Sequence, residues 1–442
     1  MTHAVVVGGS IGGLLMARAL ASRVDKVTVI DRDTPPDSPK PRRGAGQTTQ
    51  VHALLDSGRE AMESLVPGLF AAVESDGGLR ADVGEGMHWY HGGFFKIQAK
   101  MGTGINVQSR PLLEHHIRSM VGQDPKISLR YGVKCEGLVV EANTARGVRI
   151  RNEEGAEDVL SAEIVLLATG RGSQPVKWLE AVGVTPPREE VVPIGIGYAG
   201  CEFDGLSAVC TEQPILMLYG TRTKTRRHGL AFQVEGGKVL VTFMGYHGDH
   251  PPVDPEQWQA WAASLEAPEL ARALKTATPT SKVRPYRTPD QLRRHWHKCN
   301  LPEGVAVVGD AACALDPLFG QGMSVVALQA AALKGMLEKG AFSTRAAQAQ
   351  VFQLSKRAWF ITCAEASRYP ESRPHVSLPA PGVLHWFLDR VAAATSHDIA
   401  VYRAFIDVIF LRRDATWLMR PSMLWRIFRP RPRTAKQLQA TS

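Results

Sequence analysis

The sequence predicts an α/β protein with a discontinuous Rossmann-like domain, an inserted and mostly antiparallel β-sheet domain, and a helical C-terminal region. Three observations predict this arrangement. A glycine-rich turn follows a run of valines at the N-terminus, short β-type runs fill the middle of the chain, and the pattern after Gln321 is mostly helical as far as Phe428. The expected boundaries are 1–190 with 283–340 for the first domain, 191–282 for the sheet domain and 341–442 for the helical region.

The N-terminal turn has the features of a dinucleotide-binding loop. The strand-like Val5-Val6-Val7 leads into Gly8-Gly9-Ser10-Ile11-Gly12-Gly13 and then into an apolar, helix-like segment. Small residues there let backbone N–H groups approach a pyrophosphate, although Ser10 replaces the middle glycine of the usual Gly-x-Gly-x-x-Gly pattern. About 18 residues after Gly13, a second strand-like run ends at Asp31, whose carboxylate would accept hydrogen bonds from a ribose. The alternative is a tight turn that only packs a helix on a strand.

Two further motifs are expected at the same sheet. The apolar run 164–168 leads into Thr169-Gly170, and the run 305–308 leads into Gly309-Asp310 and then Pro317-Leu318-Phe319-Gly320-Gln321-Gly322. A carboxylate at that strand end would contact a ribityl or pyrophosphate group, and the helix that follows would direct its positive end at a reduced flavin ring. This favours flavin over nicotinamide as the tightly bound cofactor. The alternative for Asp310 is a plain helix N-cap.

The composition is that of a folded protein of two or three domains. The chain has 442 residues, of which 44% are hydrophobic and 21% charged. It has no stretch of the roughly 18 to 20 apolar residues that a membrane span needs, and the N-terminus leaves no room for a signal peptide, so we expect a cytoplasmic protein. The six cysteines lack metal-ligand spacing, and we predict no metal site. Cys201 and Cys210 could meet across a hairpin, but independent free thiols are favoured.

The net charge of +9 is concentrated at the C-terminus. From Arg412 to the end the chain carries eight basic residues against the single acidic Asp414, interleaved with large apolar and aromatic side chains. Such a segment suits an anionic membrane surface, which makes a peripheral position on the inner face of the membrane one expectation. The equal alternative is an apolar helix face packed on the body with solvated arginines outside. Nucleic acid is not an expected partner, because the rest of the chain shows no basic stripe.

Taken together, these motifs carry a family resemblance. The Gly8–Gly13 turn, Asp31, Arg110 before Pro-Leu-Leu-Glu, Gly309-Asp310 and the Pro-x-x-Gly-Gln-Gly segment resemble the single-component (class A) flavoprotein monooxygenases of the p-hydroxybenzoate hydroxylase type. The resemblance follows the whole chain in order. Other segments are more similar to bacterial flavin epoxidases of polyether and isoprenoid-type natural-product pathways. They are Arg42-Arg43-Gly44 with His52-Ala53-Leu54-Leu55, Ala168–Ser173 with Trp178-Leu179-Glu180, Trp359 with Arg368-Tyr369-Pro370, and the helical basic C-terminus.

The resemblance implies a bound FAD. The cofactor-binding residues expected from it and from the motifs are Gly8, Ser10, Gly12, Gly13, Asp31, Arg32, Arg43, Arg110, Gly170, Asp310, Pro317, Gly320, Gly322 and Met323. NADPH or NADH is the implied electron donor. Many members have Asp-Gly where this chain has Thr169-Gly170, and that aspartate is assigned a part in NAD(P)H binding. Its loss makes a partner reductase an alternative to direct reduction.

The implied reaction transfers one oxygen atom from O₂, through a flavin C4a-hydroperoxide, to an alkene or aromatic ring. No protein nucleophile is required, and the protein must position the substrate and exclude water. His52 is the one candidate for steering a proton, with a surface or packing histidine as the alternative. No other catalytic acid or base is nominated.

Aromatic and apolar residues favour a lipophilic substrate. They gather at Trp89-Tyr90, Phe94-Phe95, 217–219 and 243–246, although ordinary core is the alternative. The working hypothesis is epoxidation or hydroxylation of a polyketide or prenylated aromatic in secondary-metabolite or antibiotic biosynthesis. Other possibilities are a flavin-dependent reductase of isoprenoid double bonds, a non-enzymatic binding protein, and a flavin halogenase, for which the Trp-x-Trp-x-Ile-Pro segment is missing.

Overall fold

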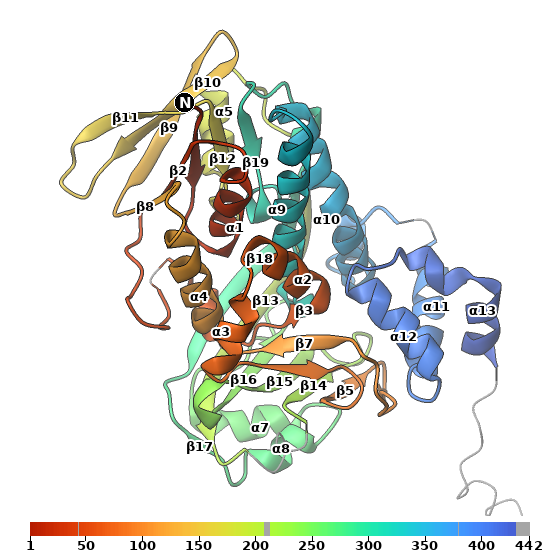
Figure 1. Cartoon of the computed structure of the whole chain (residues 1–442). Helices are drawn as coiled ribbons and strands as arrows, with labels where there is room; N and C mark the ends of the chain where they lie inside the picture. The colour runs from red at the N-terminus through yellow and green to blue at the C-terminus, as the bar shows by residue number, and fades with distance from the viewer. Residues whose placement is uncertain (43, 207–212, 379, 430–442) are drawn as a thin grey trace, which may run out of the picture.

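The computed structural model describes residues 1–42, 44–206, 213–378 and 380–429 (Figure 1). In this part of the chain, a five-stranded sheet has the order β19-β12-β1-β2-β8, and all its pairings are parallel. Its strands are β1 (His3–Val7), β2 (Lys26–Asp31), β8 (Ile127–Tyr131), β12 (Ile164–Leu167) and β19 (Val305–Val307). Strands β1, β2, β12 and β19 are buried runs of mostly β-branched and aliphatic residues, as expected for a parallel sheet covered by helices, whereas the edge strand β8 is partly exposed. The predicted α/β fold class is confirmed.

Close helix packing covers this sheet. Helix α1 (Ile11–Leu20) contacts α9 (Gln321–Lys339) through Gly12, where a Cβ would lie 3.0 Å from Cγ2 of Val326. Helix α2 (Asp56–Leu65) contacts α9 through Gly58, where a Cβ would lie 2.4 Å from Oγ of Ser324. The remaining helices of this domain are α3 (Leu69–Ser75), α4 (Arg110–Gly122) and α5 (Gln174–Glu180). Helix α4 begins as its proline predicts, with Oγ of Ser109 capping the N–H of Leu112 at 3.2 Å.

Two small sheets flank the parallel one. After β8 the chain forms β9 (Lys134–Glu141), β10 (Thr144–Arg151) and β11 (Glu157–Ser161). They form a separate antiparallel sheet. The second small sheet consists of β3 (Leu54–Leu55), β7 (Gly104–Val107) and β4 (Leu79–Asp82).

The middle of the chain forms a large, mostly antiparallel sheet, as expected. Its main strands are β13 (Glu189–Asp204), β14 (Ile215–Tyr219), β15 (Arg227–Gln233), β16 (Val239–Gly245) and β18 (Arg284–Arg294), with the short β17 (Thr278–Pro279) and β20 (Cys313–Ala314). The sheet also includes β5 (Met87–His91) and β6 (Phe94–Phe95), so that these two strands together with β18 and β20 lie outside the 191–282 segment. Strand β5 pairs with β14 in parallel, a long-range contact between segments more than a hundred residues apart.

The two faces of this sheet carry different side chains. Helices α7 (Trp258–Ala263) and α8 (Glu269–Ala273) supply core partners for one face, where Leu218 and Phe243 are buried with Trp258. Because successive strand residues alternate in direction, Met217 and Tyr219 belong to the opposite face and its separate core. The predicted aromatic segments therefore divide between structural core and cavity lining.

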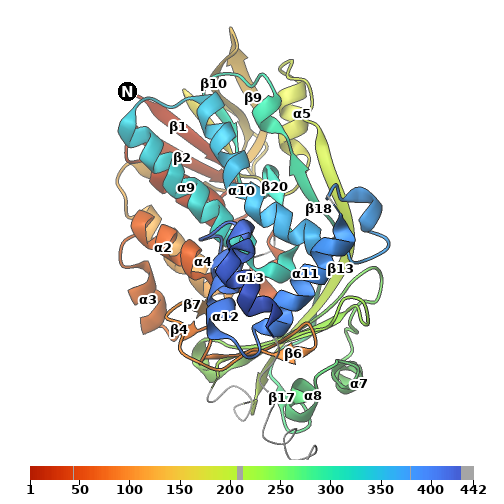
Figure 2. The same cartoon turned by 90° about the vertical axis from the view of Figure 1, so that its right-hand side faces the viewer.

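The C-terminal region is helical as predicted, with α10 (Thr344–Ala366), α11 (Pro381–Ala394), α12 (Ile399–Ile409), the 3₁₀ turn η8 (Ala415–Met419) and α13 (Pro421–Phe428). Helices α11 to α13 form a group beside the end of α10 (Figure 2). They share an apolar core consisting of Val391, Ala394, Val401, Ala404, Val408, Leu418 and Ile427. None of the helices in the described residues is long and apolar enough to cross a membrane.

A buried lysine connects this helical group to the large sheet. Lys96 follows β6 and is 2% exposed, and its Nζ donates to the carbonyl oxygens of His91 and Ala392, both at 3.1 Å. Burial lowers the pKa of Lys96 to about 7, whereas an unfolded lysine titrates near 10.4. Between these values the unfolded chain binds more protons than the folded one, so this group makes stability rise with pH.

We expect the free energy of unfolding to rise by about 2 kcal/mol from pH 7 to 9 relative to a Lys96→Met variant, whose stability lacks this contribution. Urea unfolding at several pH values measures the difference. Lys126→Met is the matched control, because Lys126 also donates to two carbonyl oxygens but lies on the surface. Equal pH dependence in the native protein and the Lys96 variant would contradict the buried-charge account.

Candidate functional site

The predicted motifs converge at one edge of the parallel sheet. Strands β1, β2, β12 and β19 are neighbours and run in the same direction, so the residues after their carboxyl ends meet there. A cavity of about 1640 Å³ opens at this edge. The predicted residues that line it are Gly8, Ser10, Gly12, Asp31, Arg32, His52, Arg110, Gly170, Asp310, Pro317, Gly320, Gly322 and Met323. Gly13 is not among the lining residues, and Arg43 lies outside the described residues.

The first glycine motif is shaped by backbone contacts. Gly8 has φ +111°, and a Cβ there would lie 2.4 Å from the carbonyl oxygen of Ala168 after β12. A Cβ on Gly13 would lie 1.7 Å from the carbonyl oxygen of Gly8, which excludes any side chain. Gly13 thus packs α1 against the turn and leaves the cavity to its neighbours. This agrees with the usual role of the third glycine in such motifs.

Asp31 is held at the end of β2 by three partners, one of which is the N–H of Asp33, which donates to Oδ1 at 3.0 Å. Its Oδ2 accepts a hydrogen bond from the N–H of Gly9 at 2.6 Å and lies 3.2 Å from Nη1 of Arg42. The carboxylate therefore bridges the glycine turn and the loop after β2, and it lines the cavity. The contact of Asp31 with a ribose hydroxyl stays a prediction.

A buried charge network extends from Asp31 along the cavity wall. Nε of Arg42 lies 2.7 Å from Oε1 of Glu114 on α4, and Glu114 Oε2 accepts from Oγ of Ser10 at 3.2 Å. Nη2 of Arg110 donates to the same Ser10 oxygen at 3.3 Å. The serine in place of the second glycine therefore connects the turn to α4.

The sequence interpretation missed Arg42, which lines the cavity, and Glu114, which pairs with it. The sequence favoured the adjacent Arg43 for this loop. Glu114 lies four residues after Arg110, a spacing that places both on one helix face and pairs them at 3.5 Å. That spacing was available from the sequence. The pairing of Arg42 with Glu114 was not, because it spans 72 residues of chain.

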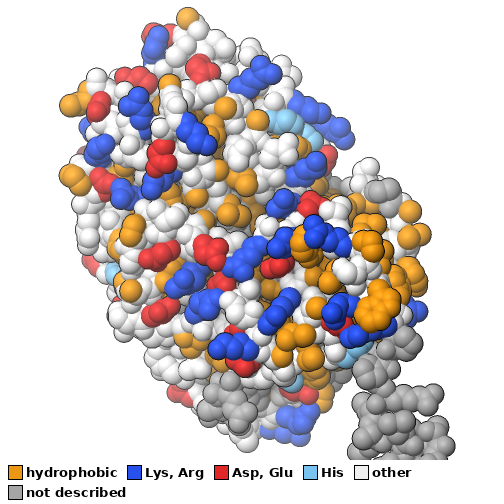
Figure 3. Space-filling view, turned by 45° about the vertical axis from the view of Figure 1, so that its right-hand side comes forward, with side chains coloured by type: hydrophobic (Ala, Val, Ile, Leu, Met, Phe, Trp, Pro, Cys, Tyr) orange, Lys and Arg blue, Asp and Glu red, His pale blue; other side chains and the backbone are white. Residues whose placement is uncertain are grey.

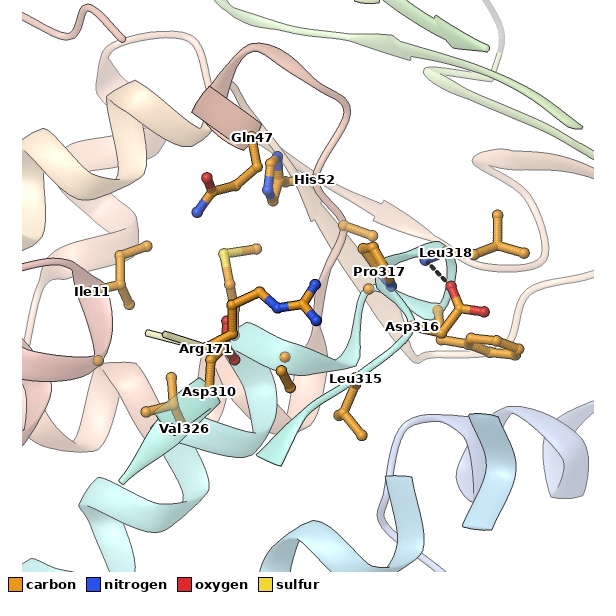
Figure 4. A pocket seen from close by; sticks show the side chains of 18 of the residues that line it. Ile11, Gln47, His52, Arg171, Asp310, Leu315, Asp316, Pro317, Leu318 and Val326 are labelled. Atoms are coloured by element: carbon orange, nitrogen blue, oxygen red, sulfur yellow. Dashed lines mark hydrogen bonds between the residues drawn. The ribbon is translucent and has the colours of Figure 1, made fainter. Parts of the chain in front are cut away.

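Asp310 follows β19 in the short 3₁₀ turn η5 (Gly309–Ala311) and points into the cavity beside Arg171 (Figure 4). The turn has no side-chain cap, and no described residue donates a hydrogen bond to this carboxylate. The N-cap alternative is therefore not seen. Although the carboxylate is open to the cavity, the surrounding protein raises the pKa of Asp310 through burial, while the positive charges of Arg110 and Arg171 oppose that rise.

His52 faces the same space (Figure 4). Its Nδ1 lies 2.8 Å from the carbonyl oxygen of Gln50, which assigns the proton to Nδ1. Burial, together with the charge of Arg110, lowers the pKa of His52 to about 3. The ring is neutral at physiological pH and has a free acceptor at Nε2. It is suited to accept a hydrogen bond and is a poor proton donor.

Residues 316–320 line the cavity where its part beside the parallel sheet meets its part on the large sheet. Asp316 caps the 3₁₀ turn η6 (Pro317–Phe319), accepting from the N–H of Leu318 at 3.0 Å (Figure 4). Gly320 then adopts φ +63° in contact with Ala53, and α9 begins. The residues of this turn line the cavity, so the N-terminal end of α9 faces it.

Beyond this turn the cavity becomes apolar and reaches the large sheet. Its lining there includes Trp89, Met217, Tyr219, Leu230, Phe232 and Met244. These residues come from β5, β14, β15 and β16. Tyr90, Phe94, Phe95, Phe243 and Tyr246, which belong to the same predicted aromatic segments, do not line it. The hydroxyl of Tyr198 is buried at this end without a hydrogen-bond partner among the described residues.

Comparison with known proteins agrees with this geometry. No family model matches the chain. Protein Rv3254 of Mycobacterium tuberculosis (strain ATCC 25618 / H37Rv) is 30% identical over 363 residues, covering 76% of this chain and 73% of that protein. The chain belongs to the family of Protein Rv3254.

Solved structures of flavoproteins share the fold of this chain. A flavoprotein/dehydrogenase from Cytophaga hutchinsonii superposes with a TM-score of 0.67 at 13% identity, covering 96% of both chains. The p-nitrophenol 4-monooxygenase PnpA from Pseudomonas putida DLL-E4 superposes with a TM-score of 0.64 at 18% identity, covering 93% of this chain and 100% of the other. The chain thus has the fold of flavoprotein monooxygenases, as the sequence resemblance implied.

Proposed function

We propose that this protein binds FAD and is a monooxygenase that inserts one atom of O₂ into a lipophilic substrate. One observation carries the proposal. A single cavity joins the three glycine motifs, Asp31 and Asp310 to an apolar compartment on the large sheet. An elongated dinucleotide fits the first part, and an apolar reactant fits the second.

The lining residues offer polar groups of the kinds that would contact the pyrophosphate and ribose of FAD. Gly8, Ser10 and Gly12 line the cavity, where their backbone would face a pyrophosphate, and Asp31 is an acceptor for ribose hydroxyls at the end of β2. Several buried polar atoms of lining residues lack a hydrogen-bond partner among the described residues, including Nε of Arg110, Oγ1 of Thr169 and Oε1 of Gln50. Asp310 is a further carboxylate without a donor. Buried polar atoms are usually satisfied, so these groups support a polar ligand.

Bound FAD would supply the redox chemistry and the activation of O₂. The protein's own groups would position the reactants. The α9 N-terminus places backbone N–H groups where negative charge is favoured. His52 would accept one hydrogen bond through Nε2 while remaining neutral. The apolar walls from β14, β15 and β16 would hold the substrate and exclude water.

NADPH or NADH is the proposed source of electrons. Thr169 occupies the position where a carboxylate is expected for direct use of these donors, and its hydroxyl has no partner among the described residues. A separate reductase is the alternative donor. The substrate that we propose is a polyketide or prenylated aromatic, with epoxidation or hydroxylation as the reaction.

An absorbance and isotope experiment tests this function. We expect the purified protein to retain about one flavin per chain and to bleach with NADPH, NADH or a reductase, faster when a lipophilic substrate is present. With isotopically labelled O₂, the product should gain one labelled oxygen atom. Protein without flavin would favour a non-enzymatic role. Anaerobic turnover that delivers hydrogen isotope from the reductant would instead identify an isoprenoid reductase, and halide incorporation would identify a halogenase.

A further inference from the structure

The C-terminal helices expose an aromatic face. It consists of Val383 and Trp386 on α11, Met419 at the end of η8, and Trp425 and Phe428 on α13, with exposed fractions of 44% to 65%. These five residues are half of the large hydrophobic side chains that are exposed in the described part of the chain. Figure 3 shows hydrophobic side chains gathered over this region with Lys and Arg side chains among them. Clustered apolar exposure of this kind marks an interaction surface.

The aromatic face is built by helix packing. Trp386 and Phe428 stack with their ring centroids 5.3 Å apart, which joins α11 to α13 on the outside. On the inside, Val391 and Ile427 belong to the core shared by these helices. The inward faces of these helices therefore pack against one another within the helical group, whereas the five residues of the aromatic face, with their tryptophan side chains, stay exposed on the outside.

Arginines border the aromatic face. Arg390 lies over Trp386, Arg429 over Trp425, and Arg420 over Trp417, with guanidinium-to-ring distances of 5.9, 5.4 and 3.3 Å. Arg429 is also paired with the buried Asp398 at 2.6 Å. Among the described residues, no carboxylate lies within ion-pair distance of Arg390 or Arg420. Tryptophan and arginine side by side match the headgroup region of an anionic bilayer.

The cavity extends to the same region. Phe360 on α10 and Met419 both line it while remaining exposed, and Leu384 and Phe387 on α11 line it as well. The cavity thus connects the helices that carry the aromatic face with the compartment on the large sheet, and charged residues such as Arg357 and Arg413 line it as well.

We propose that the protein rests peripherally on an anionic lipid bilayer through its aromatic face, and that a lipophilic substrate enters the cavity from the bilayer side. The proposal that the protein binds a bilayer depends only on the aromatic face and its arginines. The proposal that a lipophilic substrate enters from the bilayer rests on the proposed function. The bilayer is favoured over a second copy of the chain because a second copy would bring Arg390 and Arg420 together with like charges, whereas anionic headgroups complement them.

Sedimentation with vesicles tests the proposal. The full chain should bind vesicles of phosphatidylcholine with phosphatidylglycerol at low salt, and bind vesicles of phosphatidylcholine alone much less. Tryptophan fluorescence should shift to the blue on binding. Arg390→Glu with Arg420→Glu should weaken binding by at least about 25-fold, from roughly fivefold per lost arginine. Trp386→Ser with Trp425→Ser should weaken binding to the same vesicles and remove most of the fluorescence shift.

Matched controls use equally exposed positions elsewhere. Val159→Ser with Val253→Ser removes apolar side chains that are 50% and 56% exposed, and should leave binding unchanged. Absence of vesicle binding by the folded protein, or equal losses in control and aromatic-face variants, would overturn the proposal. So would a change in oligomeric state in the aromatic-face variants, which would assign the face to a second copy. Flavin content, measured in the same samples, reports separately on the proposed function.

Discussion

Asp310→Ala should lower the affinity for FAD by roughly 10- to 150-fold, the equivalent of about 1.5–3 kcal/mol for one hydrogen bond to a charged group. The carboxylate points into the cavity and has no donor from the described residues. It caps no helix, so its removal leaves no backbone group unsatisfied. The cost should therefore appear in cofactor binding and only slightly in the stability of the protein without cofactor.

Reconstitution of cofactor-free protein, followed by flavin fluorescence, measures the affinity. Asp310→Asn is the conservative variant and should retain part of it, because the amide oxygen remains an acceptor. Asp158→Ala removes an exposed carboxylate on β11 and should have no effect. Unchanged FAD affinity in a folded Asp310→Ala variant would remove Asp310 from the site.

The parts of the fold that were predictable depend on local patterns. Glycines at a strand end, a carboxylate after the next strand and β-branched buried runs are all short-range signals, and they identified β1, β2, β12 and β19 together with Gly8, Asp31 and Asp310. Asp31 and Asp310 were placed in one cavity because the carboxyl ends of parallel strands meet at one edge.

The parts that were not predictable depend on long-range pairing. Strand β5 joins the large sheet beside β14, although Trp89 and Met217 are far apart in sequence. Likewise, Arg42 meets Glu114 only because the loop after β2 lies on α4. A single sequence contains no pattern for such contacts, since they follow from which surfaces remain open once the local elements have formed.

The aromatic segments show a third limit. The sequence placed residues 217–219 and 243–246 near a substrate, but alternation along each strand assigns Met217 and Tyr219 to the cavity and Leu218 and Phe243 to the core against α7 and α8. Both faces of this sheet are apolar, so the alternating polarity that would identify the inner face is missing.

Asp316→Leu should destabilise the protein, by less than the roughly 3–5 kcal/mol of a fully unpaired buried charge, because Glu365 still lies 3.7 Å from Nε of Arg222. Asp316 is 0% exposed and the side chain of Arg222 is 5% exposed, with Nη2 of Arg222 lying 3.8 Å from Oδ2 of Asp316. Tyr246 bridges them, donating to Oδ2 of Asp316 at 2.7 Å and accepting from Arg222 at 3.1 Å. Burial raises the pKa of Asp316, while Arg222 and the hydrogen bond from Tyr246 oppose that rise and favour the carboxylate.

The double variant Arg222→Met, Asp316→Leu separates the ion pair from the rest of the segment. If the lost stability comes from an uncompensated charge, removing both partners should cost clearly less than the sum of the two single replacements, since buried pairs replaced by apolar residues are often nearly neutral. Urea unfolding followed by tryptophan fluorescence measures all four proteins. Asp316→Asn keeps an acceptor for the N–H of Leu318 and so tests the cap of η6 separately. Additive single costs would mean that the pair has no coupling, and that Asp316 serves only to cap the turn between the two halves of the cavity.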